Sequence, residues 1–221
     1  LHEHNEAQRL EPVLSRLEGG ASIAVISDAG TPLISDPGFQ LVREARRRGI
    51  AVSPVPGASA ITAALSVAGL PTDRFLFAGF LPSAAGPRKT ALAELAEVPA
   101  TLAFYESPKR LAAMLRDAAA VLGGTRRAAV CRELTKKFEE VAAGTLAELA
   151  ERYAGATVKG EIVVLVDRGD SENIKEDDLN RLLEPALKAH SLRDAVDSVA
   201  ARTGLPRRRV YQAALKLDRG D

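Results

Sequence analysis

The 221-residue chain has no tryptophan, and aromatic residues make up only 4% of it. Widespread stacking of nucleic-acid bases on aromatic side chains is therefore not expected. The formal net charge is only +1, so a nucleic-acid partner would have to be bound by a local basic patch. Cys131 is the only cysteine, which excludes an internal disulfide and favours a reducing, cytoplasmic compartment.

Long apolar runs are also missing. No stretch approaches the roughly 18 apolar residues that a membrane helix needs, so we expect no membrane partner. The opening, Leu-His-Glu-His-Asn-Glu at residues 1–6, is not followed by the apolar core of a signal peptide. Because the first residue is not methionine, we expect a fragment or a processed chain.

Several common catalytic motifs are absent. The sequence contains no G-x-S-x-G, no Walker A loop and no G-x-G-x-x-G. The missing dinucleotide fingerprint argues against a Rossmann cofactor site. His2 and His4 lie two residues apart without cysteine partners, so no metal site is expected there.

Strand-like and helical patterns alternate from about residue 22 to residue 168, which predicts an α/β fold. Strands are predicted at residues 22–28, 50–53, 101–105, 128–132 and 162–166. Turn-rich and polar stretches then divide the chain into three parts. These are a partial N-terminal lobe at residues 1–70, a second α/β lobe at 74–168 and a helical tail at 174–221.

The most informative segment reads Ser-Asp-Ala-Gly-Thr-Pro-Leu-Ile-Ser-Asp-Pro-Gly, at residues 27–38. An apolar run leads into it and a helical pattern follows. Ligands bind at the carboxyl ends of strands in open α/β sheets, and Gly30 and Gly38 permit backbone angles that a side chain would forbid. We therefore predict a binding site here, although most loops between a strand and a helix bind nothing.

Two helix starts have recognisable capping residues. Asp36 suits the N-cap of the helix after the loop, and Pro37 suits its first position. Thr145 and Glu148 have the spacing of a capping box.

Three more segments place polar residues after predicted strands. They are Pro-Gly-Ala-Ser-Ala at residues 56–60, Phe-Tyr-Glu-Ser-Pro-Lys-Arg at 104–110, and a densely charged run at 131–140. The first offers the N–H groups of a helix start to a polar ligand. Each segment alone is explained equally well as a turn, a cap or surface charge. Together with residues 27–38 they predict one cleft.

The tail has three helical patterns, two of them joined by a turn at residues 203–206, as in a helix-turn-helix. Arg207, Arg208 and Arg209 begin the last helix, where a recognition helix would contact nucleic acid. A solvated basic cluster on a small packing domain is an equally good interpretation.

These segments, with Lys-Gly-Glu at 159–161, resemble the motif series of the ribosomal RNA small subunit methyltransferase I family, in the tetrapyrrole methylase-like superfamily. The resemblance implies S-adenosylmethionine-dependent 2′-O-methylation of a cytidine ribose in 16S ribosomal RNA, without a metal. It also implies two α/β lobes with the cofactor between them, and a homodimer. The cofactor residues that it implies are Ala29, Gly30, Thr31, Ile34, Ser59, Ala60 and Tyr105.

The sequence departs from this family at its start. Members begin with a strand and a Thr-Pro-Ile-Gly-Asn-Leu loop, and neither is present here. We therefore expect the first lobe to lack its opening strand and one wall of the cofactor pocket. The chain as given is then expected to bind cofactor weakly or not at all.

The implied reaction needs a group near the ribose hydroxyl, which loses its proton as it attacks. We hypothesise that Glu106 or Glu133 orients or deprotonates it. Four cations are predicted to hold RNA phosphates, namely Lys109, Arg110, Arg132 and Lys136. Two alternatives stay open: a small-molecule, tetrapyrrole-type methylase on the same scaffold, and a non-catalytic RNA-binding or assembly protein.

Overall fold

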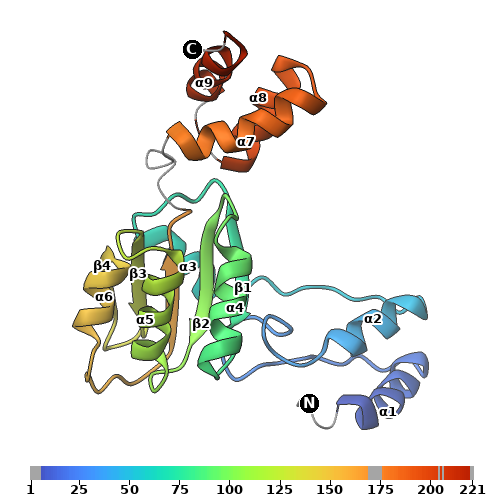
Figure 1. Ribbon diagram of the computed structural model, residues 1–221. Helices are drawn as coiled ribbons and strands as arrows, with labels where there is room; N and C mark the ends of the chain where they lie inside the picture. The colour runs from blue at the N-terminus through green and yellow to red at the C-terminus, as the bar shows by residue number, and fades with distance from the viewer. Residues whose placement is uncertain (1–5, 169–175, 204, 206, 220–221) are drawn as a thin grey trace. The chain divides into compact units, whose positions relative to one another are not determined.

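The computed structural model describes residues 6–168, 176–203, 205 and 207–219. The chain divides into two compact units, Leu1–Ala63 and Ala64–Asp221 (Figure 1). The predicted opening motif, most of the polar boundary after residue 168 and half of the turn at 203–206 lie outside the described residues.

The N-terminal unit is built on two helices, α1 (Glu6–Glu18) and α2 (Phe39–Arg47). Leu14, Leu41 and Ala45 form a buried apolar cluster in it, and the residues that pack against them include Val25 and Val52. A third helix, α3 (Ala60–Val67), begins at the end of this unit.

The strands predicted at residues 22–28 and 50–53 are not formed, because neither segment pairs with a strand in the described part of the chain. Both segments still alternate inward and outward positions: Val25 packs on the apolar cluster, whereas Ile26 is 88% exposed. The period of two is therefore present, but the ladder of hydrogen bonds that defines a sheet is not.

The start of α2 differs from the prediction based on Asp36 and Pro37. The residue before the helix is Gly38, with φ 125°, and no side chain at that position caps the helix. Instead, Oε1 of Glu6 accepts hydrogen bonds from the backbone N–H groups of Gly38, at 3.2 Å, and Gln40, at 3.0 Å. A carboxylate more than thirty residues away thus satisfies N–H groups that local sequence was expected to satisfy.

The second unit contains a five-stranded mixed sheet with the order β1-β2-β5-β3-β4. Its strands are β1 (Phe75–Phe80), β2 (Thr101–Glu106), β3 (Arg127–Arg132), β4 (Glu140–Thr145) and β5 (Ile162–Val166). β1 and β2 pair in parallel, and every other pair is antiparallel. The strand predicted at residues 162–166 is present as β5, and all five of its residues are buried, as is usual for an unbroken apolar strand.

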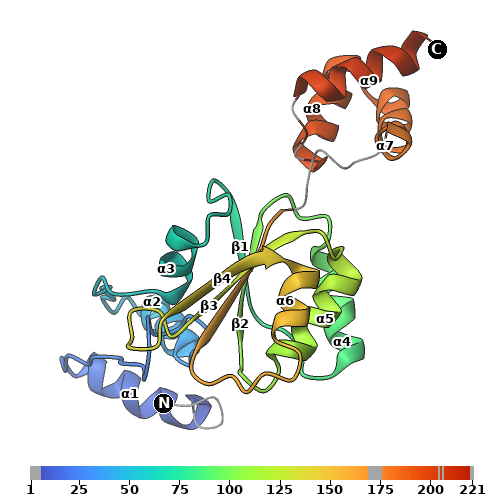
Figure 2. The ribbon, with the colours of Figure 1, turned by 90° about the vertical axis from the view of Figure 1, so that its left-hand side faces the viewer.

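Three helices cover one face of this sheet, as Figure 2 shows: α4 (Ala85–Leu95), α5 (Leu111–Leu122) and α6 (Leu146–Arg152). Leu102 and Phe104 of β2 belong to the apolar core formed with these helices. Because strand side chains alternate, Tyr105 lies on the opposite face. The capping box at Thr145, with Glu148 as its partner, is confirmed at the start of α6.

The register of the sheet determines which loops meet at one edge. Glu106, the last residue of β2, and Arg132, the last residue of β3, both pair with Ile162, the first residue of β5. The carboxyl ends of β2 and β3 therefore lie on either side of the start of β5.

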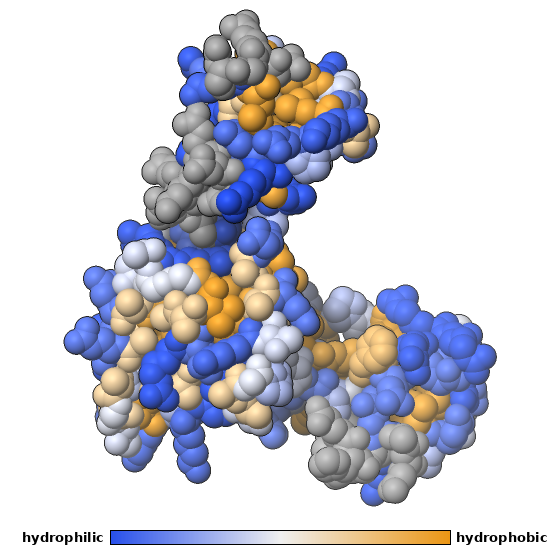
Figure 3. Space-filling model, viewed as in Figure 1, coloured by the Kyte–Doolittle hydropathy of each residue, from blue (hydrophilic) through white to orange (hydrophobic). Residues whose placement is uncertain are grey.

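The tail consists of α7 (Glu176–Ala189), α8 (Leu192–Thr203) and α9 (Arg207–Arg219). Leu183, Val196 and Val210 belong to one apolar cluster made entirely of tail residues, and orange apolar side chains gather in the tail in Figure 3. Within the described residues, no helix combines the length and apolarity needed to cross a bilayer.

Candidate functional site

The loop at residues 27–38 has a defined backbone conformation. Ser27 Oγ donates to the carbonyl oxygens of Ala29, at 3.1 Å, and Gly30, at 3.2 Å. Gly30 has φ 66°, and two residues with side chains, Leu33 (φ 72°) and Ser35 (φ 59°), also take left-handed conformations. For Leu33 and Ser35 such conformations cost about 1–3 kcal/mol each, and strain of this kind clusters at functional sites, which agrees with the predicted site.

This loop contacts the second predicted segment of the N-terminal unit. Thr31 Oγ1 donates to the carbonyl oxygen of Ala58 at 3.1 Å. This hydrogen bond joins the loop at residues 27–38 to the segment at residues 56–60. Its two residues, Thr31 and Ala58, are 27 positions apart in the sequence.

Six of the seven predicted cofactor residues lie in the N-terminal unit. Of these, Ala29, Gly30, Thr31 and Ile34 are exposed, whereas Ser59 and Ala60, at the start of α3, are half-buried. Exposed backbone and the 44% exposed side chain of Ile34 leave this loop accessible to a ligand.

Tyr105, the seventh, lies in the second unit and belongs to a cluster of rings. Its ring centroid is 4.9 Å from that of Phe77 and 5.5 Å from that of Phe80. Phe80 is 55% exposed. The sequence analysis did not single out either phenylalanine. Their place beside Tyr105 comes from the parallel pairing of β1 with β2, and sequence does not show which strands pair.

Glu106 is buried beside Arg110. The Glu106 side chain is 0% exposed, and its Oε1 accepts a hydrogen bond of 2.6 Å from the backbone N–H of Ser107. Arg110 Nε lies 3.0 Å from the same oxygen, but its N–H is not aligned for a hydrogen bond. A second Arg110 nitrogen donates to the carbonyl oxygen of Leu81. Both residues therefore hold the loops that follow β1 and β2.

Glu133 begins the loop after β3 and is held by three contacts. Its Oε1 accepts from the backbone N–H of Glu161, at 2.9 Å, and from Lys136 Nζ, at 3.0 Å, and its own N–H donates to the Glu161 carbonyl. The Glu161 N–H and then Lys136 hold the pKa of Glu133 below its ordinary value of 4.5. Lys136 also contacts the Glu161 carboxylate at 2.9 Å, so it bridges two acids.

The four cations predicted to hold phosphates differ in availability. Arg132 pairs with Glu140 at 3.0 Å, and Arg110 and Lys136 have the carboxylate contacts described above. Lys109 is exposed and has no ion pair within the described residues. The register brings all four to the same edge of the sheet.

The basic residues of the tail are also unequal. Arg207 Nε lies 2.5 Å from Asp197 of α8, which ties the start of α9 to the preceding helix. Arg208 is exposed, and Arg209 is half-buried.

Cys131 is buried in β3. Burial, reinforced by the nearby Glu139 charge, raises the pKa of its thiol to about 11. The thiol is therefore protonated at neutral pH and unsuited to nucleophilic attack. Among the described residues, no group of three or more His, Cys, Asp or Glu side chains is placed to hold a metal ion.

Comparison with known proteins places the chain among methyltransferases. Residues 1–150 match the model of the tetrapyrrole (corrin/porphyrin) methylases, and residues 173–218 match the RsmI C-terminal HTH domain. Curated relatives named "Ribosomal RNA small subunit methyltransferase I" include one from Mesorhizobium japonicum, 49% identical over 98% of this chain and 74% of that protein. Another, from Pseudomonas aeruginosa, is 47% identical over 97% of this chain and 78% of that protein.

Solved structures share the fold at low identity. The methyltransferase CobJ aligns with TM-score 0.56 and 20% identity, covering 73% of this chain and 71% of its own. Diphthine synthase aligns with TM-score 0.56 and 17% identity, covering 76% of this chain and 68% of its own.

Proposed function

The chain belongs to the ribosomal RNA small subunit methyltransferase I family, and we propose that it methylates the 2′-hydroxyl of a cytidine ribose in 16S ribosomal RNA. It is a methyltransferase with the tetrapyrrole methylase fold and a C-terminal helix-turn-helix domain. The observation that carries the proposal is the 49% identity to a protein of that name over nearly the whole chain.

The cofactor is S-adenosylmethionine, which supplies an activated methyl group on a positively charged sulfur. The residues present fit such a ligand. Residues 29–31 expose their backbone on a loop with left-handed conformations, and Ile34 offers an exposed apolar side chain. Ser59 and Ala60 stand at the end of the segment that Thr31 contacts. We assign these residues and Tyr105 to cofactor binding.

The ribose hydroxyl must be positioned and must release its proton. Of the two carboxylates proposed for this task, Glu133 is the one a substrate can reach, because its side chain is 18% exposed and that of Glu106 is 0% exposed. The lowered pKa of Glu133 makes it a ready hydrogen-bond acceptor but a weak base. Glu133 thus orients the hydroxyl, and Glu106 positions Arg110 and the loop after β2.

Phosphates of the RNA are bound at the same edge. Lys109 can contact a phosphate directly, because its side chain is exposed and no ion pair with a carboxylate has to break first within the described residues. Arg110, Arg132 and Lys136 contribute by exchanging an internal partner for a phosphate. In the tail, Arg207, Arg208 and Arg209 at the start of α9 provide a second RNA contact.

The substrate is tested by transfer of tritium from labelled S-adenosylmethionine. The chain is extended for this assay by the family's opening strand and Thr-Pro-Ile-Gly-Asn-Leu loop, so that a missing pocket wall does not decide the result. Small ribosomal subunits, protein-free 16S ribosomal RNA and a porphyrinogen are offered separately, with the Pseudomonas aeruginosa relative as the positive control. We expect label in the ribosomal RNA, within a cytidine dinucleotide that resists alkali because its 2′-oxygen is methylated. Label in the porphyrinogen would establish the small-molecule alternative. Failure of this extended chain to bind cofactor in a calorimetric titration would favour the non-catalytic alternative.

The role of Glu133 is tested by Glu133→Gln, with Glu106→Gln as the comparison. We expect Glu133→Gln to lower kcat about 10²-fold at unchanged cofactor affinity, the scale expected when a reacting group is misplaced by about 1 Å. Glu106→Gln is expected to lower thermal stability as well, because it weakens a buried ion pair. Normal turnover of Glu133→Gln would remove it from this role.

Assembly and location extend the same proposal. The working protein is a homodimer in the cytoplasm that needs no metal, and its functional parts are residues 1–70, 74–168 and 174–221. Sedimentation of the protein with and without chelator tests whether it is a dimer and whether the dimer depends on a metal. Methyl transfer with and without chelator tests whether the reaction depends on one.

A further inference from the structure

We propose that one exposed face of α2 binds an unpaired segment of the RNA substrate. This face, the α2 stripe, consists of Phe39, Arg43 and Arg46. The inference rests on the proposed function, and it adds an RNA contact in the N-terminal unit.

The three side chains are placed together by helical spacing. They stand at i, i+4 and i+7, so they lie on one side of the helix over about 10 Å of its length. Leu41 and Ala45, on the opposite side, are the buried residues of α2. The stripe therefore faces solvent while the apolar side holds α2 in the unit.

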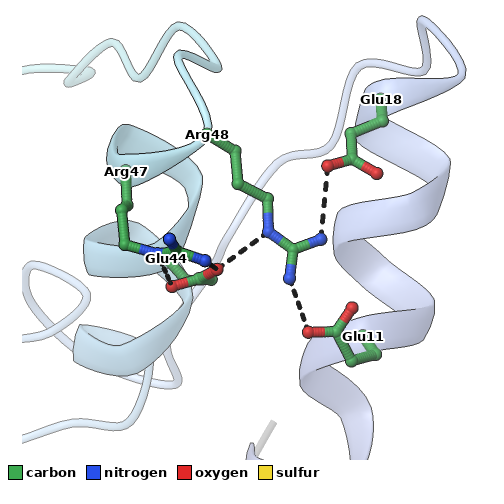
Figure 4. Close-up of polar contacts among 5 residues, drawn as sticks. All are labelled: Glu11, Glu18, Glu44, Arg47 and Arg48. Carbon is green, nitrogen blue, oxygen red and sulfur yellow. Dashed lines mark hydrogen bonds and ion pairs between the residues drawn. The ribbon is translucent and has the colours of Figure 1, made fainter.

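The stripe is defined by which arginines already have partners. Arg48 contacts Glu11 at 2.5 Å, Glu18 at 3.2 Å and Glu44 at 2.8 Å, and Arg47 contacts Glu44 at 2.7 Å (Figure 4).

By contrast, Arg43 and Arg46 are exposed and have no carboxylate within ion-pair distance in the described parts of the chain. Arg46 is in the last turn, where a cation also stabilises the helix dipole. Arg43 stands a turn earlier, near the middle of the helix, where that effect has faded.

Phe39 points to the chemistry of the partner. It is 61% exposed, and the guanidinium carbon of Arg43 lies 5.4 Å from its ring centroid. Unpaired bases stack on aromatic rings and on guanidinium planes, and arginine binds phosphate through two hydrogen bonds. A membrane would require the apolar side of α2, which is buried. An acidic peptide would use the arginines but would leave the ring without a partner.

Position on the chain adds to this argument. Phe39 follows directly after residues 27–38, the loop proposed to bind cofactor. RNA bound along the stripe would thus contact the helix that directly follows the proposed cofactor loop.

The test measures binding of protein-free 16S ribosomal RNA at several salt concentrations. Arg43→Gln with Arg46→Gln should weaken binding about tenfold or more and should reduce the slope of log K against log salt by about 1.4, at roughly 0.7 per phosphate contact on a single strand. Phe39→Leu should weaken binding about fivefold or more without changing the slope, because stacking carries no counterion. Arg47→Gln removes one arginine charge from the same helix, outside the stripe, and is the control, expected to stay within about twofold of wild type. Arg43→Gln alone, which also removes one charge, is compared with it and should weaken binding more.

Arg43→Lys with Arg46→Lys should restore most of the slope, which a misfolded helix would not do, and unchanged circular dichroism confirms folding. Binding of both the double glutamine variant and Phe39→Leu within twofold of wild type would overturn the α2 stripe. Displacement of the RNA by polyglutamate at equal charge concentration would also overturn the α2 stripe, because an acidic peptide does not use the Phe39 ring. Methyl transfer by the wild type is measured separately, and its failure would reject the proposed function. Normal methyl transfer together with normal RNA binding by the variants would reject the α2 stripe alone.

Discussion

Glu133 and Gly160 show how single residues shape the candidate site. A Cβ atom on Gly160 would lie 2.4 Å from Cγ of Glu133, so the glycine leaves the space that the carboxylate side chain occupies. Gly160 also has φ 94°, a conformation that side chains disfavour. The position of Glu133 therefore depends on the absence of a side chain 27 residues further along the chain.

Gly160→Ala is expected to displace the Glu133 carboxylate from the N–H of Glu161 and from Lys136. The variant should lose activity to the same extent as Glu133→Gln. Gly155→Ala is the matched control, because Gly155 has φ 70° but no atom within 4 Å of an added Cβ. Both variants should lose about 1–2 kcal/mol of unfolding free energy from the backbone conformation. Kinetic assays and thermal unfolding separate the two effects, and equal activity in both variants would contradict the displacement.

At the scale of elements, α1 and α2 are joined by contacts that span the chain. Glu6 of α1 caps α2, and Glu11 and Glu18 of α1 contact Arg48, the residue that follows α2. Glu44 accepts hydrogen bonds from Arg47 and Arg48, and they lower its pKa from 4.5 to about 2 (Figure 4).

This shift predicts a pH dependence of stability. A carboxylate whose pKa is lower in the folded state stabilises that state above its ordinary pKa, and the contribution is lost as the pH falls through the folded value. The wild type should therefore lose more unfolding free energy than Glu44→Gln between pH 4.5 and about pH 2. Urea unfolding of both proteins across this range measures the difference. Added salt should reduce this difference, since these groups are near the surface. If the unfolding free energies of the two proteins changed in parallel with pH, Glu44 would contribute nothing to the pH dependence.

At the scale of the whole molecule, the apolar cores are separate. The core of α4, α5, α6 and the sheet contains no tail residue, and the core of the tail contains no residue from outside it. Each core should therefore respond to mutation on its own.

Leu183→Ala and Leu102→Ala compare the two cores with the same substitution, because Leu183 belongs to the tail core and Leu102 to the core of the sheet and its helices. Both leucines are 0% exposed, so each change should cost about 2–5 kcal/mol where it occurs. In amide hydrogen exchange, Leu183→Ala should speed exchange in α7, α8 and α9 and leave β5 protected. Leu102→Ala, in the strand that pairs with β5, should do the reverse. Loss of protection in β5 caused by Leu183→Ala would mean that the tail and the sheet unfold together.

Local features were predictable from sequence. The capping box at Thr145 involves residues three positions apart, and the five apolar residues of β5 show a strand buried on both faces. The conformational requirement at Gly30 follows from its place in a tight loop. In each case the interaction that matters lies within a few residues, where spacing alone determines the geometry.

Features that depend on distant partners were missed. The cap of α2 comes from Glu6, not from Asp36, because a folded neighbour can offer a carboxylate that sequence distance hides. The strands predicted at residues 22–28 and 50–53 have the right alternation, but a strand also needs a neighbour to bond with.

The chain's family, its catalytic class and the order of its loops were therefore determined by sequence, since motif identity and spacing are properties of the chain itself. Tertiary structure decided which charges are available. Arg48, Lys136 and Arg132 have the carboxylate partners Glu11, Glu161 and Glu140, whereas Lys109 and Arg43 have none within the described residues. The physical reason is that an ion pair depends on a few ångströms of separation, and only the fold brings partners that are 8, 25 and 37 positions apart to that distance.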